Sequence, residues 1–439
     1  MSILNRNKSF LITITLVLSS FAAIAQQDGM NVFSPYTFYG IGSMNMLGSA
    51  ENKSMAGAGI ATRNSVYMNA LNPAGLSAVP SQTFLFSFGV QGDNNYLKTS
   101  ANKSSNNTFN ISEVGLQFPI ARNLGFGFIM NPYSSVGYKM SQNSTDPNII
   151  ANLGNVSYNY KGSGGTTLLK AGFGWEPFIG KGLSIGANLL YYHGSIDRSA
   201  ETNIDPVMDP TKIYRTIQSV STYQFGKLNA EIGAIYSLKL KNNKTLNFGL
   251  TYQPKMNITV DQSKDITSFS EVSSDSIYSA SSKTKLVLPQ KFSAGISYGS
   301  PKLEFSLDYI YQNFENAYQI AAAESNISLT KYQDIRMGLS YTPNRYDIRS
   351  AMKRWTYRAG LRYGNSYMTV NGKKIDDYSL TIGVGVPLQQ NGLTHMNLGF
   401  DVGRRGSIKN TFVQETYFRI YLGVNLFVTQ EWFVRHKFK

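Results

Sequence analysis

The feature that most constrains this chain is a strict alternation of apolar residues with small or polar ones, repeated up to its C-terminal part. The segment 418–428 is an example. In water, such a strand would be half-buried in a sandwich, whereas in a bilayer one face would contact lipid and the other a wet lumen. The second interpretation places Phe418, Ile420, Leu422, Val424, Leu426 and Val428 in lipid, with Arg419 and Asn425 facing the lumen.

The pattern begins near residue 82 and recurs in about 14 segments, an even number as in bacterial single-chain barrels. Short turns alternate with longer polar loops near residues 140–155, 196–214 and 261–282. A large soluble β-sandwich is disfavoured because segments of about 10 residues keep one fully apolar face throughout. We therefore predict an all-β protein, a transmembrane antiparallel β-barrel of about 14 strands. Because the number of strands is even, the first strand should begin and the last strand should end on the periplasmic side.

The N-terminus predicts export. Arg6 and Lys8 precede an apolar stretch, residues 10–24, that is too short to span a bilayer as a helix. Residues 23–25 form a small-x-small cleavage site, so residues 1–25 are expected to be a cleaved signal peptide and Gln26 the mature N-terminus. The expected location is the outer membrane of a Gram-negative bacterium, in contact with membrane lipid.

Composition excludes several classes of protein. The chain has no cysteine, which rules out an acylated lipoprotein, a disulfide framework and a thiolate metal site. Charged residues make up only 15% of the chain, against roughly 25% in an ordinary globular protein. The net charge is +15, and many of the charges lie in turns and loops. No nucleic-acid-binding motif accompanies them, so we expect no nucleic-acid partner.

Residues 26–81 do not follow the strand pattern. They are rich in Gly, Ala, Ser and Asn and have no sustained apolar face. A barrel of about 14 strands has an interior too wide for its wall side chains to fill. We therefore expect residues 26–81 to form a hatch, or plug, in the lumen, with the barrel over residues 82–439; a periplasmic tail is the less favoured alternative.

Several motifs give the chain a resemblance to a known family. The segment 54–61 (SMAGAGIA), followed by Asn72-Pro73-Ala74, is similar to the N-terminal hatch of FadL-type outer-membrane porins. Strand signatures of that family are similar to residues 162–165, 183–188, 288–292 and 307–309, and residues 34–42 and 432–435 resemble a divergent branch of it. The resemblance implies a 14-stranded barrel whose hatch motif contains Gly57, Gly59, Asn72, Pro73 and Ala74, and which passively takes up hydrophobic molecules such as long-chain fatty acids.

Family members release their cargo sideways through a gap at a kinked third strand, and here Asn131-Pro132 follows Met130 in the third predicted strand. A proline cannot donate a hydrogen bond to a neighbouring strand, so it should produce a bulge or a break. Pro132 could equally mark the exit of that strand into a loop.

No catalytic, cofactor or metal site is expected, and we do not predict an enzyme. Two Gly-x-Ser-x-Gly matches, at residues 182–186 and 295–299, lie inside regular strand alternation, whereas a nucleophile elbow requires a strand-to-helix turn. The three histidines, His193, His395 and His436, have no partner at a convincing metal-ligand spacing.

Lumen-facing charges offer a candidate ligand site. Alternation places Arg336, Arg358 and Arg362 inside the barrel, where they could hold a ligand carboxylate by paired hydrogen bonds. The favoured alternative is that they pair with Glu304 and Asp308 and hold the plug in place. Hydrophobic cargo would need an apolar pocket between plug and wall, for which candidates are Met44, Met46, Leu47, Met55, Ile60, Tyr67, Met68 and Leu71.

The leading functional hypothesis is therefore an outer-membrane channel for a hydrophobic small-molecule ligand, with hatch gating and lateral exit near the third strand. The alternative is a non-transporting barrel that binds protein as a subunit of a secretion or outer-membrane assembly complex. Either protein would meet the barrel-assembly machinery during biogenesis, although its assembly signal would be unusual because Phe438 is penultimate and Lys439 follows it.

Overall fold

The computed structural model describes residues 30–178, 181–205, 214–270, 273–317, 320, 326–389 and 393–429. The expected signal peptide, residues 26–29 of the expected hatch, His436 and the C-terminal segment 432–439 lie outside the described residues.

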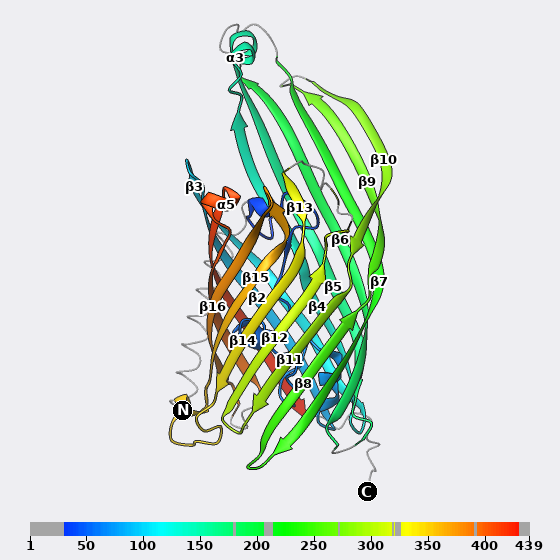
Figure 1. The fold of residues 1–439 in the computed structure, drawn as a ribbon, viewed down its shortest axis with the longest axis vertical. Helices are drawn as coiled ribbons and strands as arrows, with labels where there is room; N and C mark the ends of the chain where they lie inside the picture. Colours follow the sequence, from blue (N-terminus) through cyan, green and yellow to red (C-terminus); the bar gives the residue numbers. More distant parts are fainter. Residues whose placement is uncertain are drawn as a thin grey trace.

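The wall is a closed antiparallel barrel of 14 strands, as predicted (Figure 1). Three of these strands are interrupted, so each carries two labels: β8/β9, β10/β11 and β13/β14. Pro254 and Pro289 lie at the first two interruptions, where the missing N–H breaks the ladder. Closure comes from β18, which pairs with β2 from Gln414–Lys98 to Thr429–Thr83. The wall strands are β2 (Thr83–Lys98), β3 (Lys103–Ala121), β4 (Leu124–Asn143), β5 (Asn155–Trp175), β6 (Leu183–Asp205), β7 (Thr216–Leu240), β8 (Lys244–Gln253), β9 (Met256–Phe269), β10 (Ser274–Leu288), β11 (Lys291–Gly299), β12 (Leu303–Asn313), β13 (Ile327–Leu329), β14 (Lys331–Tyr341), β15 (Thr356–Val370), β16 (Lys373–Pro387), β17 (His395–Arg405) and β18 (Gln414–Thr429).

The alternation determines which way each side chain points. Along β18, Phe418, Leu426 and Val428 are exposed on the outer face, whereas Asn425 is buried inside. Among the described residues, no helix is both long and apolar enough to cross a membrane.

Residues 30–82 lie inside the barrel, where Figure 1 shows them in blue. They form η1 (Pro35–Thr37), β1 (Ser43–Met44), α2 (Ala50–Lys53) and η2 (Pro73–Ala78). Inward glycines of the wall make room for them. A Cβ on Gly186 would lie 2.4 Å from the Pro73 carbonyl carbon, and one on Gly233 would lie 2.1 Å from the Asn72 side-chain oxygen. Gly186, the last glycine of one Gly-x-Ser-x-Gly match, therefore provides space for Pro73 of the plug.

The long connections differ from the expectation of polar loops. Much of residues 196–214 and 261–282 belongs to β6, β9 and β10, which continue as strands well beyond the front wall (Figure 1). Long ladders sustain them, since β5 and β6 pair from Trp175–Ile185 to Asn155–Asp205. We call the projecting parts of β5, β6, β7, β9 and β10 the fin. The remaining helices are α3 (Pro147–Leu153), α4 (Ala351–Arg354) and α5 (Ile408–Thr411).

Candidate functional site

The barrel wall is interrupted between β3 and β4. Their pairing runs from Ala121–Leu124 only as far as Val114–Met130. Beyond that point β3 pairs with β2 as far as Lys103, and β4 pairs with β5 as far as Asn143. Two neighbouring strands therefore separate halfway along the barrel, and we call this break the lateral opening.

Asn131 and Pro132 lie where the two strands separate. The β4–β5 register shifts between Pro132 and Ser134, and the β2–β3 register shifts where Ser112 is left without a partner. The Asn131 amide donates a hydrogen bond to the Ser112 carbonyl at 3.0 Å, the last contact before the opening. The irregularity fits the missing N–H of proline.

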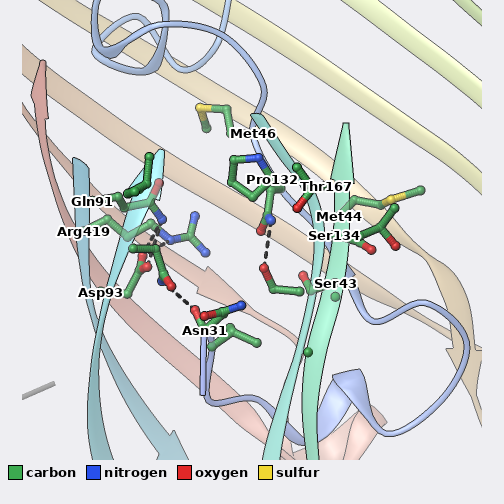
Figure 2. Close-up of a pocket in the computed structure, with 18 of the residues that line it drawn as sticks. Asn31, Ser43, Met44, Met46, Gln91, Asp93, Pro132, Ser134, Thr167 and Arg419 are labelled. Atoms are coloured by element: carbon green, nitrogen blue, oxygen red, sulfur yellow. Dashed lines mark hydrogen bonds and ion pairs between the residues drawn. The ribbon is translucent and has the colours of Figure 1, made fainter. Parts of the chain in front are cut away.

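A cavity of about 520 Å³ is lined both by lumen-facing residues and by residues at the lateral opening. This volume lies within the range of ligand pockets, roughly 300–1,000 Å³. Figure 2 shows Gln91, Asp93 and Arg419 on one side of the cavity and Pro132, Ser134 and Thr167 on the other. The lining also includes Phe109, Ile111 and Met130 at the break, and the outward-facing His193.

The inner end of the cavity is polar and charged. Arg419 pairs with Asp93 at 2.9 Å and with Asp401 at 3.3 Å. Lys53, only 1% exposed, donates one long hydrogen bond of 3.4 Å to Gln91. Burial lowers the pKa of Lys53 to about 8, against the opposing effects of Glu113 and Asp93.

Two buried hydroxyl groups at the cavity are available to a ligand. Ser134 and Thr166 are each 2% exposed and line the cavity. Within the described part of the chain, neither Oγ nor Oγ1 has a hydrogen-bond partner. Buried polar groups in native proteins are almost always paired, so these two indicate a site that receives a polar group or water.

The N-terminal segment closes the lateral opening from inside. In β1, Ser43 and Met44 pair with Ser135 and Ser134 of β4. The Ser34 N–H donates to the Gly137 carbonyl at 2.8 Å, and the Asn110 amide of β3 donates to the Asn31 carbonyl at 2.7 Å. The plug thus bridges both strands that border the gap.

The hatch motif binds the opposite wall. Gly57 and Gly59 have positive φ angles of 76° and 149°, which residues with side chains rarely adopt. The turn they form places the N–H groups of Gly59 and Ile60 at 2.6 and 2.9 Å from one carboxylate oxygen of Asp308.

The Asn-Pro-Ala motif acts as a helix cap and a wall anchor. Asn72 accepts a hydrogen bond from the Ala74 N–H at 3.0 Å and caps η2, with Pro73 at the first helical position. The Asn72 amide also donates to the Ile60 carbonyl at 2.9 Å and, at longer range, to the wall carbonyls of Ala234 and Leu250. Pro73 and Ala74 thus lie in the first turn of η2, which Asn72 caps.

Replacing Asp308 with alanine is expected to loosen the plug. The variant leaves the buried N–H groups of Gly59 and Ile60 without an acceptor, at a cost of about 2–4 kcal/mol. Limited proteolysis of the folded barrel should then cut within residues 30–81 faster than in the parent, and Asp308→Asn, which keeps an acceptor oxygen, should lie between the two. Equal protection in all three proteins would show that this carboxylate does not hold the plug.

The three candidate arginines all face the lumen, but the prediction that they form ion pairs with Glu304 and Asp308 was wrong. Arg336 pairs with Asp334 at 2.7 Å, and Arg362 pairs with Asp334 at 2.9 Å and with Asp377 at 3.2 Å. Alternation predicted which residues point inward, but which of them meet depends on the stagger of the strands.

The arginines differ in what they do for the plug. Arg336 donates to the Gly57 carbonyl at 3.1 Å. Arg358 donates to the Asn397 side chain at 2.9 Å and lines a separate cavity of about 120 Å³ near Glu304 and His395. Only Arg362 also lines the cavity at the lateral opening, and two carboxylates already bind it.

The apolar pocket between plug and wall is small. Met44, Leu47, Ile60 and Leu71 line a cavity of only about 40 Å³. Met55 and Met68 are buried, at 0% and 4% exposure. The packing at this place leaves no room for an acyl chain, whereas Met44 also lines the larger cavity at the lateral opening.

Sequence reasoning missed Lys53 and Asp334. Lys53 is the last residue of the short helix α2. The sequence signal for this helix is Ser49 as the N-cap with Asn52 three residues later, and in the structure these two form a capping box. Asp334 lies two residues before Arg336, so the same alternation that turned the arginine inward also turns the carboxylate inward.

Comparisons with known proteins agree with this architecture. The solved structures that it resembles include the CymD monoaromatic hydrocarbon channel, with a TM-score of 0.56 and 15% identity over 87% of this chain and 98% of that one. The Ralstonia pickettii toluene transporter TbuX gives a TM-score of 0.55 with 14% identity, over 87% and 98% of the two chains. A Pseudomonas aeruginosa FadL homologue gives 0.55 with 12% identity, over 88% and 100%. At these identities the likeness shows the fold, and the predicted FadL-like barrel is confirmed.

No curated protein matches the sequence. A family model does: that of BamG matches residues 7–439, nearly the whole chain. This barrel, with its plug and its lateral opening, belongs to the BamG family.

Proposed function

We propose that this barrel is an outer-membrane channel for passive uptake of hydrophobic, fatty-acid-like small molecules, which leave sideways through the lateral opening. One observation carries the proposal. The cavity of about 520 Å³ reaches from the lumen to the place where β3 and β4 separate, beside Asn131 and Pro132. A molecule in that cavity lies beside the break in the wall, with only the N-terminal segment between it and the lateral opening.

The lining favours an amphiphile over a pure hydrocarbon. The inner end presents the buried cations Lys53 and Arg419, whereas Phe109, Ile111 and Met130 lie at the break. A carboxylate or another polar group would lie inside and an apolar chain would point to the membrane. Two of the similar structures are a monoaromatic hydrocarbon channel and a toluene transporter, whose named cargoes are smaller and less polar.

Passage requires the plug to move. Asn31, Ser43 and Met44 line the cavity and also hold β3 and β4. Withdrawal of residues 30–46 would widen the cavity and leave the rest of the plug bound to Asp308 and the opposite wall. This movement of residues 30–46 is the proposed hatch gating.

Binding of an anionic amphiphile is expected to weaken as pH rises through about 8. The lowered pKa means that Lys53 is protonated below about 8 and neutral above it. An anion therefore gains a charge-assisted hydrogen bond only at the lower pH, and affinity should fall roughly tenfold between pH 7 and pH 9.5. Titration of the detergent-solubilised barrel with a fluorescent fatty acid would measure this, and Lys53→Met should bind weakly at both pH values. Equal affinity at both pH values in the parent would remove Lys53 from the site.

A second function is favoured by a different observation. On the fin, β10 (Ser274–Leu288) pairs with β9 along one edge, whereas β12 takes its partners from β11 and β14. Among the described residues, the other edge of β10 has no strand partner over 274–285. Its backbone donors and acceptors form a row there that another extended chain could complete. The barrel would then act as the protein-binding subunit of an envelope complex.

Native mass spectrometry separates the two functions. The tagged barrel would be extracted from its own outer membrane in mild detergent. A stoichiometric fatty acid or other amphiphile would support the channel and identify its cargo class. An empty barrel with a defined protein partner would overturn the channel in favour of the protein-binding subunit.

A further inference from the structure

One connection at the periplasmic end does not fit a simple barrel. The β14–β15 loop spans residues 342–355, whereas two other turns at that end span only 241–243 and 300–302. Short turns are usual on this side of outer-membrane barrels.

The β14–β15 loop exposes large apolar side chains. Ile348 is 96% exposed, Tyr346 81% and Met352 60%. The loop is nevertheless folded: Asn344 N–H donates to the Lys353 carbonyl at 2.8 Å, and Asp347 accepts from the N–H groups of Arg349 and Ser350 at 2.9 and 2.7 Å. A folded loop that presents three apolar side chains marks a binding surface.

The same loop is basic. Arg345, Arg349, Lys353 and Arg354 stand against one acidic residue, Asp347, which gives a net charge of +3 (4 − 1). Among the described residues, the only ion pair in this loop joins Lys353 to Asp347 at 3.7 Å. Its cations are therefore largely uncompensated.

The β14–β15 loop lies beside aromatic residues at the lipid-facing end of the wall. Tyr341 and Tyr357 lie opposite each other at the ends of β14 and β15, on the lipid-facing side and in line with the exposed Leu339. The Tyr357 hydroxyl donates to the Met352 carbonyl at 3.1 Å, which ties α4 to this outer face of the wall. Aromatic residues at strand ends mark the level of the lipid headgroups.

We propose that the β14–β15 loop is a binding site for anionic phospholipid in the periplasmic leaflet of the outer membrane. Tyr346, Ile348 and Met352 enter the boundary between headgroups and acyl chains, and Arg345, Arg349 and Lys353 contact the phosphates. This site goes beyond the channel function, since it lies outside the wall and does not depend on what passes the lateral opening.

The absence of cysteine allows a direct test. The Ile348→Cys variant would carry an environment-sensitive fluorophore, and the full barrel would be reconstituted in vesicles of phosphatidylcholine with or without phosphatidylglycerol. Brominated acyl chains should quench the label, more strongly with phosphatidylglycerol present. Reversing three loop charges in Arg345→Glu/Arg349→Glu/Lys353→Glu should expose the label, since each basic residue strengthens such contacts roughly fivefold.

A matched control reverses three lysines at the same end of the barrel, in Lys239→Glu/Lys241→Glu/Lys244→Glu, and should leave the label at position 348 in lipid. A second label on Lys302→Cys, in the exposed β11–β12 turn, gives the reference for full exposure to water. The proposal would be overturned if aqueous iodide quenched the label at position 348 as strongly as the label at position 302. It would also be overturned by a label that is shielded only in native outer-membrane fragments, because protein would then cover the loop.

Discussion

Replacing Asp334 with alanine is expected to destabilise the barrel by about 3–5 kcal/mol, the usual cost of breaking a buried ion pair from one side. Asp334 is 0% exposed and binds both Arg336 and Arg362, so the variant leaves two buried cations without their shared partner. Urea unfolding of the barrel in lipid vesicles, followed by the heat-dependent gel shift of folded barrels, would measure the loss.

Two controls make this result specific. Asp275→Ala removes the partner of Arg215 in an exposed pair and should cost at most about 1 kcal/mol. Adding Arg336→Met and Arg362→Met to Asp334→Ala should recover much of the stability, because no unpaired buried charge is left. If Asp334→Ala unfolds like Asp275→Ala, the lumen charges are too hydrated to hold the barrel together.

Tethering the plug to β4 is expected to reduce uptake through the barrel at least about tenfold, if passage requires residues 30–46 to move. Ser43 and Ser135 are direct partners across the β1–β4 ladder, so the Ser43→Cys/Ser135→Cys variant can form a disulfide across it. Uptake of a fluorescent fatty acid by cells or vesicles would be compared before and after reduction, and reductant should restore it.

The matched control places the disulfide on the fin, in Ser157→Cys/Asn203→Cys, where the two residues are partners between β5 and β6. This bond should leave uptake unchanged. Full uptake through the oxidised Ser43–Ser135 variant would mean that the plug does not gate the path.

The wall could be predicted from the sequence because alternation in a strand directly determines which face each side chain takes. Phe126 and Phe128 point outward from β4 as expected, while Gly125 and Gly127 point inward against Leu76 of the plug. The fin could not be predicted, since its strands carry exposed polar side chains in consecutive positions, such as Ser281 and Ser282 of β10. Backbone pairing identifies this segment as strand.

The candidate site was only partly predictable. Pro132 indicated where a ladder would break, because the loss of an N–H is a local property. That β3 and β4 separate, and that Lys53 of the plug meets Arg419 of the last strand at the same cavity, depends on how the closed barrel brings distant segments together. No local pattern contains that information.

Photo-crosslinking tests the lateral opening most directly. A fatty acid with a diazirine near its methyl end would be bound to the barrel and activated, and the modified residues mapped by mass spectrometry. Our account predicts labelling of the cavity lining around Phe109, Met130 and Ser134. Labelling spread evenly over the lipid-facing wall, with none at these residues, would contradict it.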